Sequence, residues 1–237
     1  MIRPSIAAVL PAGLLLFSGC AHPKALPRLP EPPAEIPGYV ALLGARSSGT
    51  EGTSRARVAA AFLAPSSLRL EILDPAGSTR AVLISSEEGA LYLDPAARSY
   101  RTFPDGAGAL DALVGIEAPS DLLARLVLGP AAAMQGLVCA GEAPTTCKLP
   151  GGGELHLLHA SPSSAEIVDP RTGTVEVRWD RSVAASGEIP RATELRLPAR
   201  GAMLRLEMRE LRFTAPETSL FSLLPPVGFH PAEPSGR

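Results

Sequence analysis

Histidine, glycine and serine residues occur in this sequence at spacings that could support catalysis or metal binding. His156 and His159 lie three residues apart in a strand-like segment, so their side chains point to opposite faces and do not form a metal pair. Residues 151–153 are three glycines without the helix and lysine of a phosphate-binding loop, which favours a hairpin turn. The sequence has no Gly-x-Ser-x-Gly, His-Glu-x-x-His or Cys-x-x-Cys motif, and no serine is marked as activated. We expect no enzyme activity, no metal and no cofactor; a hydrolase without a familiar motif is the rival hypothesis.

Cys20 is a cysteine whose context indicates modification of its thiol. It follows a 14-residue apolar run, residues 6–19, which is shorter than the ~20 residues that span a bilayer. With Arg3 in front, this run has the pattern of a secretory signal peptide. The end of the run, "FSGC", resembles the bacterial lipobox, which predicts cleavage after residue 19 and acylation of Cys20, with palmitate among the chains. The alternative is an ordinary signal peptide with a chance cysteine.

Residues 20–37 are predicted to form a lipidated spacer. Six prolines lie between residues 21 and 37, a composition that favours extended polyproline II. Ala21 is not the Asp that marks inner-membrane retention in enteric lipoprotein sorting, so the predicted location is the outer membrane, facing the periplasm.

Cys139 and Cys147 are the pair that is left once Cys20 is acylated. Export places them in an oxidising compartment, and their spacing is not that of a metal site. The sequence therefore predicts a disulfide across a loop between two strands.

Composition restricts the class of protein. There are 22 Lys and Arg against 24 Asp and Glu, with no basic run, which argues against a nucleic-acid-binding protein. Aromatic residues make up 4%, so the core must be mainly aliphatic. We expect one domain at residues 38–226, a flexible tail at 227–237, and a monomer.

Alternating polarity from residue 38 onward predicts a mainly β (α+β) protein. In "SLRLEIL", Leu68, Leu70 and Ile72 share one face, and "DPAGST" is the turn that follows. Similar segments bring the total to about nine to eleven strands in a curved antiparallel half-barrel with a polar outer face. Leu206 and Leu211 are out of phase in the last strand, which predicts a bulge near residues 209–210.

Short helices are predicted at "AGALDALVG", "PSDLLARLVLGP" and "ETSLFSLL". The second is the clearest, because Ser120 and Asp121 suit a helix start and Gly129-Pro130 end it. Two or three such helices would cover the apolar face of the sheet.

Several of these segments resemble one family, the LolB-like lipoprotein receptors of the LolA/LolB lipoprotein-carrier superfamily. They are "LRLEILDPAGSTRAVLI", "GIEAPSDLLARLVLG", "DPRTGTVEVRW" and "MLRLEMRELRF", in that order. The resemblance implies a half-open barrel around an apolar cavity that binds acyl chains of lipoproteins, and a LolA-type periplasmic carrier as partner. It implies an outer-membrane lipoprotein that accepts lipoproteins from that carrier. The alternative is a structural or assembly lipoprotein of the envelope with the same fold and a filled core.

The face assignment gives the residues expected to line the cavity. The strand residues are Leu68, Leu70, Ile72, Val82, Ile84, Leu91, Leu93, Val175, Val177, Trp179, Leu204 and Leu206. The lid residues are Leu110, Leu113, Leu122 and Leu126. The alternative is that all of them form an ordinary packed core.

The loop at Pro75, Ala76 and Gly77 departs from the family pattern. In the receptors the position of Ala76 carries a protruding Leu that is used in delivering lipoproteins to the membrane. The alanine argues against efficient membrane insertion and leaves acyl-chain binding open.

Overall fold

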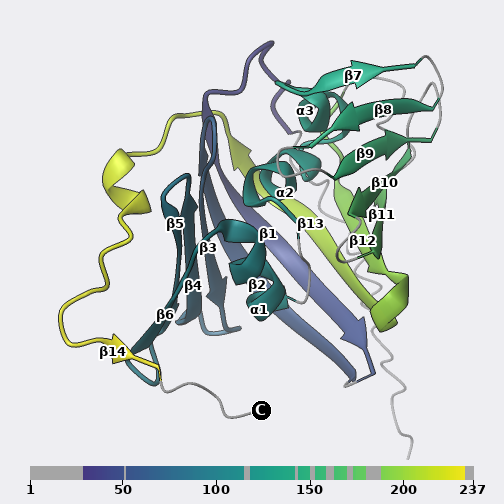
Figure 1. Cartoon of the computed structure of the whole chain (residues 1–237). Helices are drawn as coiled ribbons and strands as arrows, with labels where there is room; N and C mark the ends of the chain where they lie inside the picture. Colours follow the sequence, from purple (N-terminus) through teal and green to yellow (C-terminus); the bar gives the residue numbers. More distant parts are fainter. Residues whose placement is uncertain are drawn as a thin grey trace, which may run out of the picture.

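Fourteen strands form one open, curved sheet in the part of the chain that the structure, a computed structural model, describes (Figure 1). The described residues are 29–50, 52–114, 118–141, 144–149, 153–158, 163–169, 173–179 and 188–232. The strands are β1 (Gly38–Gly49), β2 (Gly52–Leu63), β3 (Ser67–Leu73), β4 (Thr79–Ser86), β5 (Gly89–Asp94), β6 (Ser99–Phe103), β7 (Val138–Ala140), β8 (Thr145–Lys148), β9 (Glu154–Leu157), β10 (Ser164–Asp169), β11 (Gly173–Trp179), β12 (Ala192–Leu197), β13 (Ala202–Arg212) and β14 (His230–Pro231).

The sheet order follows from hairpins on either side of one long-range pairing. It runs β14-β6-β5-β4-β3-β2-β1-β13-β12-β11-β10-β9-β8-β7. Every neighbouring pair is antiparallel except β14 with β6, which is parallel. The predicted fold class, a curved antiparallel sheet with short helices, is confirmed. The described sheet has fourteen strands where the sequence predicts nine to eleven, because short strands such as β7 and β14 carry little local signal.

Three short α-helices lie on one face of this sheet, in front of β1–β4 and beside β7–β8 in Figure 1. They are α1 (Gly106–Val114), α2 (Ser120–Leu126) and α3 (Pro130–Met134). The first two match predicted segments, whereas α3 was not predicted. The third predicted helix is a 3-10 turn, η2 (Thr218–Phe221), and a second such turn, η1 (Pro198–Arg200), follows β12.

The predicted bulge in β13 is confirmed. Leu42 pairs with Glu210 and Leu43 with Met208, so Arg209 is the extra residue. Because the bulge shifts the alternation by one residue, Met208 and Leu211 are both buried in the same apolar cluster.

The outer face of the sheet is not polar throughout, which corrects the sequence-based expectation. Ala61, Val82, Ile84, Leu91 and Leu93 form an apolar cluster there with Phe221. The C-terminal segment crosses this face, and Leu223 and Phe229 pack against the cluster. A second strip of strand side chains can be apolar because this segment covers it.

The same segment includes part of the tail that is predicted to be flexible, residues 227–237, and packs it against the sheet. Phe229 packs on the outer cluster, and His230–Pro231 pair with β6. The His230 N–H donates to the Arg98 carbonyl at 3.0 Å, and the Ala232 N–H donates to the Tyr100 carbonyl at 2.8 Å. The folded part of the chain therefore extends to Ala232, and residues 233–237 lie outside the described residues.

Every element and all three apolar clusters lie between residues 29 and 232. A chain that begins at Ala21 therefore keeps all the packing that the structure describes.

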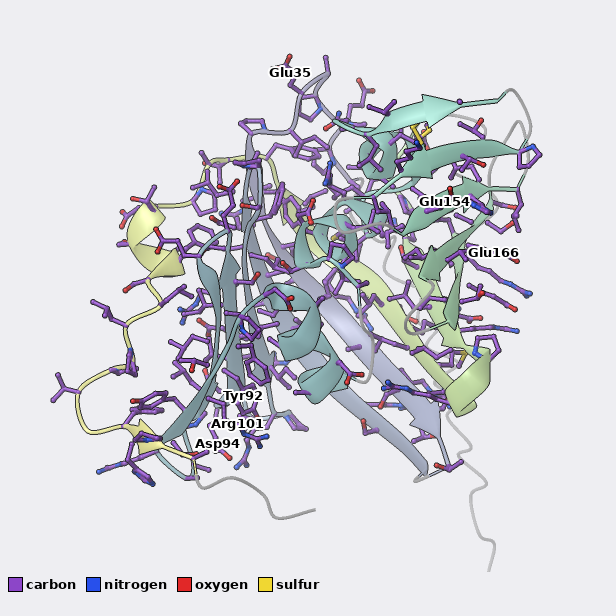
Figure 2. The ribbon with its side chains drawn as sticks, viewed as in Figure 1. Glu35, Tyr92, Asp94, Arg101, Glu154 and Glu166 are labelled. Atoms are coloured by element: carbon purple, nitrogen blue, oxygen red, sulfur yellow. A yellow bond between two sulfur atoms is a disulfide. The ribbon has the colours of Figure 1, made fainter. Side chains whose placement is uncertain are left out.

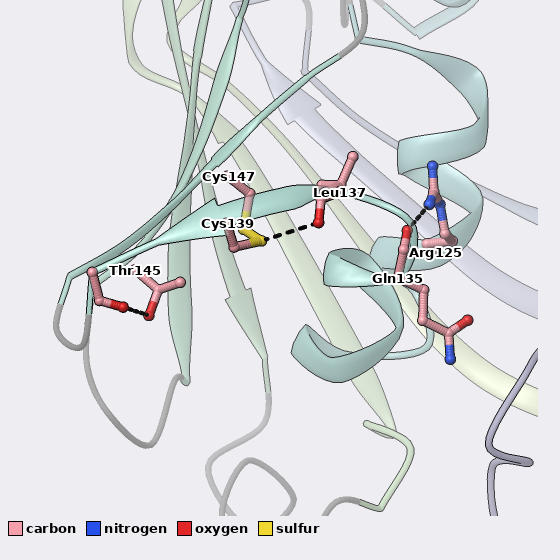
Figure 3. The surroundings of a disulfide bond; sticks show 7 residues. Arg125, Gln135, Leu137, Cys139, Thr145 and Cys147 are labelled. Carbon is pink, nitrogen blue, oxygen red and sulfur yellow. Dashed lines mark hydrogen bonds between the residues drawn. A yellow bond between two sulfur atoms is a disulfide. The ribbon is translucent and has the colours of Figure 1, made fainter.

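Cys139 and Cys147 form a disulfide between β7 and β8 (Figure 3). The two residues are directly opposite in the antiparallel register, with their Cα atoms 4.0 Å apart. Cys147 is fully buried in the largest apolar cluster, so the bridge joins the edge hairpin to the core.

Removing this bridge should lower stability. The Cys139→Ala/Cys147→Ala variant is expected to lose about 2–3 kcal/mol of unfolding free energy, because the short loop is no longer closed in the unfolded chain. Denaturant unfolding of the oxidised chain, the reduced chain and the variant measures this. The reduced chain is the control, and unchanged stability on reduction would contradict the expectation.

Candidate functional site: an apolar cavity under the helices

A cavity of about 320 Å³ lies between the helix-covered face of the sheet and the helices. It is bounded by β1, β2, β3 and β13 on the sheet side and by α1 and α2 opposite. The lining residues are Tyr39, Leu43, Ala45, Ser47, Ser48, Ser54, Ala56, Val58, Ala60, Leu68, Leu70, Ile72, Leu110, Leu123, Ala124, Val127, Leu197, Ala202, Met203, Leu204 and Leu206. None is charged, and most are aliphatic.

Small side chains on β1 and β2 account for the space. Ala45 is opposite Ala56, and Ala41 is opposite Ala60, on the helix-covered face. Elsewhere on this face, larger residues such as Trp179 and Leu195 fill the gap to the helices and form a packed cluster. The cavity therefore lies where the sequence supplies alanine in place of leucine or tryptophan.

One end of the cavity is closed by Tyr39 and α2. The Tyr39 hydroxyl donates to the Ala124 carbonyl at 2.8 Å, and the Tyr39 ring lies 5.6 Å from that of Phe62. Complete burial raises the pKa of Tyr39 far above its usual value, because the phenolate would lose its hydration. Tyr39 thus stays neutral and fixes α2 over the cavity.

The other end carries the polar lining residues. Ser47 and Ser54, near the β1–β2 turn, share a hydrogen bond of 2.6 Å between their hydroxyl oxygens, and both are exposed. Ser48 and Met203 complete this rim. A ligand with an apolar tail and a polar head matches this gradient from buried aliphatic to exposed hydroxyl groups.

Hydrogen bonds from both halves of the sheet hold α2 in place. Trp179 Nε1 donates to the Leu126 carbonyl at 2.7 Å, from β11. From β4, the buried Ser85 and Ser120 hydroxyls are 2.7 Å apart, and Gly106 leaves room for them because a Cβ there would overlap both. The cover of the cavity is thus attached to the strands on either side of it.

Arg125 ties α2 to the segment that follows α3. Its guanidinium pairs with Asp121 one turn earlier and donates to the Gln135 carbonyl (Figure 3). At the exposed side, Arg200 Nη1 is 2.6 Å from Asp111 Oδ1, which joins η1 to α1.

Six of the predicted site residues line the cavity. They are Leu68, Leu70, Ile72, Leu204, Leu206 and Leu110. The prediction omitted all of β1 and β2, the α2 residues Leu123 and Ala124, and Val127, which directly follows α2. Ala45, Ala56 and Ala60 carry a weak hydrophobic signal, so only their alternation with larger or charged neighbours could have marked them.

Val82, Ile84, Leu91 and Leu93 do not face the cavity, which corrects the face assignment. Leu70 pairs with Leu83, so Leu83 takes the inward position and its neighbours Val82 and Ile84 point outward. Leu93 and Leu91 pair with these two and share their face. The cause is that β4 is apolar on both faces, so its pattern does not reveal which side is inward.

The remaining predicted residues lie near the cavity without lining it. Val175, Val177 and Trp179 face the helices and are packed with Leu122 and Leu126 in the largest cluster. At β11 the space between the sheet and the helices is therefore filled by side chains, which is the packed core that the alternative to a cavity predicts there. The side chain of Leu113 lies outside the described residues.

The β3–β4 loop lies at the same end of the sheet as the β1–β2 turn. Pro75, Ala76 and Gly77 are exposed, and Gly77 has a φ of +92° that favours glycine. The Ser78 N–H donates to Asp74 Oδ1 and, with Arg80, lowers the pKa of the Asp74 carboxyl. Arg57 Nη2 donates to the Asp74 and Pro75 carbonyls at 3.3 and 3.2 Å, which fixes the loop against β2.

Other polar groups lie apart from the cavity. Arg101 is 5.8 Å from the centre of the Tyr92 ring, near Asp94 (Figure 2), and partial burial followed by the Asp94 charge raises the pKa of Tyr92. His156 Nε2 lies 2.8 Å from Glu154 Oε2. His159 and residues 151–152 are outside the described residues. Within the described ranges, no group of three or more His, Cys, Asp or Glu side chains could hold a metal ion.

Solved structures share this architecture. A LolA superfamily protein from Nitrosomonas europaea matches with a TM-score of 0.54 at 11% identity, over 82% of this chain and 92% of that one. The fold is LolA-like. A DUF1329 family protein from Desulfovibrio piger matches with a TM-score of 0.52 at 9% identity, over 80% of this chain and 91% of that one.

The sequence comparisons give no closer assignment. The sequence matches no protein-family profile and no curated protein. Among the described residues, no helix has the length and hydropathy to cross a membrane.

Proposed function

We propose that this protein binds an acyl chain in the cavity under α1 and α2, as an acyl-chain-binding lipoprotein of the bacterial envelope. The observation that carries the proposal is the uncharged, mainly aliphatic lining, with Leu70 and Leu206 at the wall and Ser47 and Ser54 at the exposed end. Removing a methylene from water stabilises a complex by about 0.8 kcal/mol, so such a lining is sufficient to hold a chain. The LolA-like fold supports the proposal by analogy.

The finer form of the proposal is a LolB-like role. The protein accepts the acyl chains of a lipoprotein from a LolA-type periplasmic carrier at the outer membrane, without catalysing a reaction. The exposed loop at Ala76 has no large apolar side chain, so delivery into the bilayer is expected to be slow unless another surface contacts the membrane.

A transfer experiment tests this role. An acylated lipoprotein bound to a LolA-type carrier is mixed with the chain from Ala21 onward, and the lipoprotein is followed by affinity capture. A non-acylated cargo is the control. Transfer of the acylated cargo alone is the expected result; no transfer of either cargo would favour the envelope assembly role.

Anchoring rests on Cys20. The Cys20→Ala variant is expected to lose palmitate labelling and to leave the membrane fraction, because acylation and anchoring both need this thiol. Cys139→Ala is the matched control and should keep the label. Persistent labelling of Cys20→Ala would contradict the lipoprotein assignment.

A further inference from the structure

The face of β1, β2 and β13 that is turned away from the helices carries a basic groove of about 520 Å³. Five arginines line it, namely Arg46, Arg55, Arg57, Arg205 and Arg209. Glu207 is the one acidic residue of its lining, and all five arginines are exposed. The whole chain has a net charge of −2, so this arginine groove is a local concentration of positive charge.

The strand register places three of these arginines side by side. Arg46 is directly opposite Arg55 on β2 and directly opposite Arg205 on β13. Like charges at directly opposite positions of a sheet destabilise it. Such a row is explained if an anion bridges the guanidinium groups.

The protein compensates this charge only in part. Glu207 accepts from Arg205 at 3.3 Å and from Arg209 at 3.0 Å, and Arg57 binds the β3–β4 loop. Arg46 and Arg55 make no hydrogen bond or ion pair with any other residue that the structure describes. Two adjacent guanidinium groups are thus available to a ligand.

The groove and the open end of the cavity lie on opposite faces of the same part of the sheet. Ala45 and Ala56 border both, because only one layer of strands separates them there. The Ser47–Ser54 rim is adjacent in sequence to Arg46 and Arg55. A surface that exchanges an acyl chain with the cavity would therefore approach these arginines.

We propose that the arginine groove binds the phosphate groups of anionic phospholipids at a membrane surface and holds the open end of the cavity against that surface. Guanidinium groups bind phosphate oxygens in pairs of parallel hydrogen bonds, and membrane leaflets that contain anionic lipids attract clustered arginines. The orientation of the cavity rests on the proposed function, whereas the phosphate contact does not.

Vesicle binding tests the proposal. The chain from Ala21 onward is titrated with vesicles of phosphatidylcholine, with and without phosphatidylglycerol. The Arg46→Gln/Arg55→Gln variant should bind the anionic vesicles about 25-fold more weakly, at about fivefold for each arginine. The matched control, Arg178→Gln/Arg196→Gln, removes the same charge from β11 and β12, and it should change binding little.

Two results would overturn the proposal. Equal losses of affinity for anionic vesicles in the two double variants would show that net charge, and not a specific site, attracts the protein to the vesicles. No preference of the unmodified chain for anionic vesicles would exclude a phospholipid site and favour an acidic protein segment as the occupant. Uptake of a fluorescent fatty acid is measured in parallel, and Arg46→Gln/Arg55→Gln should retain it, so that failure of this proposal is distinguished from failure of the cavity.

Discussion

Replacement of Leu70 by glutamate is expected to weaken acyl-chain binding at least tenfold. Leu70 lines the cavity on β3, is opposite Ala60, and packs with both apolar clusters of the helix-covered face. Binding of an acyl chain would remove the hydration of a carboxylate at this position, which costs free energy. No cationic side chain lines the cavity to pair with the carboxylate. Binding of a fluorescent fatty acid, measured by titration, gives the affinity.

Matched variants separate this effect from damage to the fold. Leu73→Glu places the same charge on the same strand. Residue 73 is directly opposite Arg57 of β2, on the face turned away from the helices, and does not line the cavity. Ala56→Phe narrows the cavity without adding charge. We expect Leu73→Glu to keep fatty-acid binding and Ala56→Phe to lose it. A folded Leu70→Glu protein with unchanged affinity would contradict the cavity as the binding site.

Replacement of Trp179 by alanine is expected to cause the largest loss of stability. The indole is buried in the main cluster and donates to the Leu126 carbonyl at 2.7 Å, so it both fills the core and holds α2. Deleting a buried aromatic side chain costs about 3–5 kcal/mol, which for a domain of this size lowers Tm by roughly 6–20 °C. Thermal unfolding followed by circular dichroism measures the shift.

Trp179→Phe isolates the hydrogen bond from the packing. Besides the loss of packing from the smaller ring, losing this hydrogen bond should lower the free energy of unfolding by only about 1 kcal/mol. The Leu126 carbonyl is not left without a donor, because the Gly129 N–H also donates to it. Arg178→Ala, an exposed neighbour, should change stability by no more than about 0.5 kcal/mol. A Trp179→Ala protein as stable as Arg178→Ala would show that α2 does not depend on β11.

The fold class could be predicted because most strands have one apolar face. In β11 the alternation of Val175 and Val177 with charged residues identifies the inward face, and the phase change at Arg209 identifies the bulge. The inward faces of β1 and β2 are hard to predict from the sequence, because alanine, glycine and serine give a weak alternation signal. The edge strand β14 depends on pairing with the distant β6, which no local pattern indicates.

The site could be predicted only in part. Leu68, Leu70 and Ile72 were placed correctly, since β3 alternates between apolar and charged residues. Val82 and Ile84 were placed on the wrong face, because the C-terminal segment buries the outer side of β4 and removes the need for polar residues there. The volume of the cavity depends on where small side chains of the sheet lie opposite the helices. Which strand residues lie opposite which helix residues is known only from the structure.

The most direct test of acyl-chain binding locates the chain within the protein. A fatty acid with a nitroxide near its methyl end is added to the chain from Ala21 onward with isotope-labelled methyl groups. We predict the strongest paramagnetic broadening for the signals of Leu68, Leu70 and Leu206, and weaker broadening for those of Val82 and Leu91 on the other face. Broadening of Val82 and Leu91 that exceeds that of Leu68, Leu70 and Leu206, or broadening of no signal at all, would contradict the proposal that the cavity under α1 and α2 binds acyl chains.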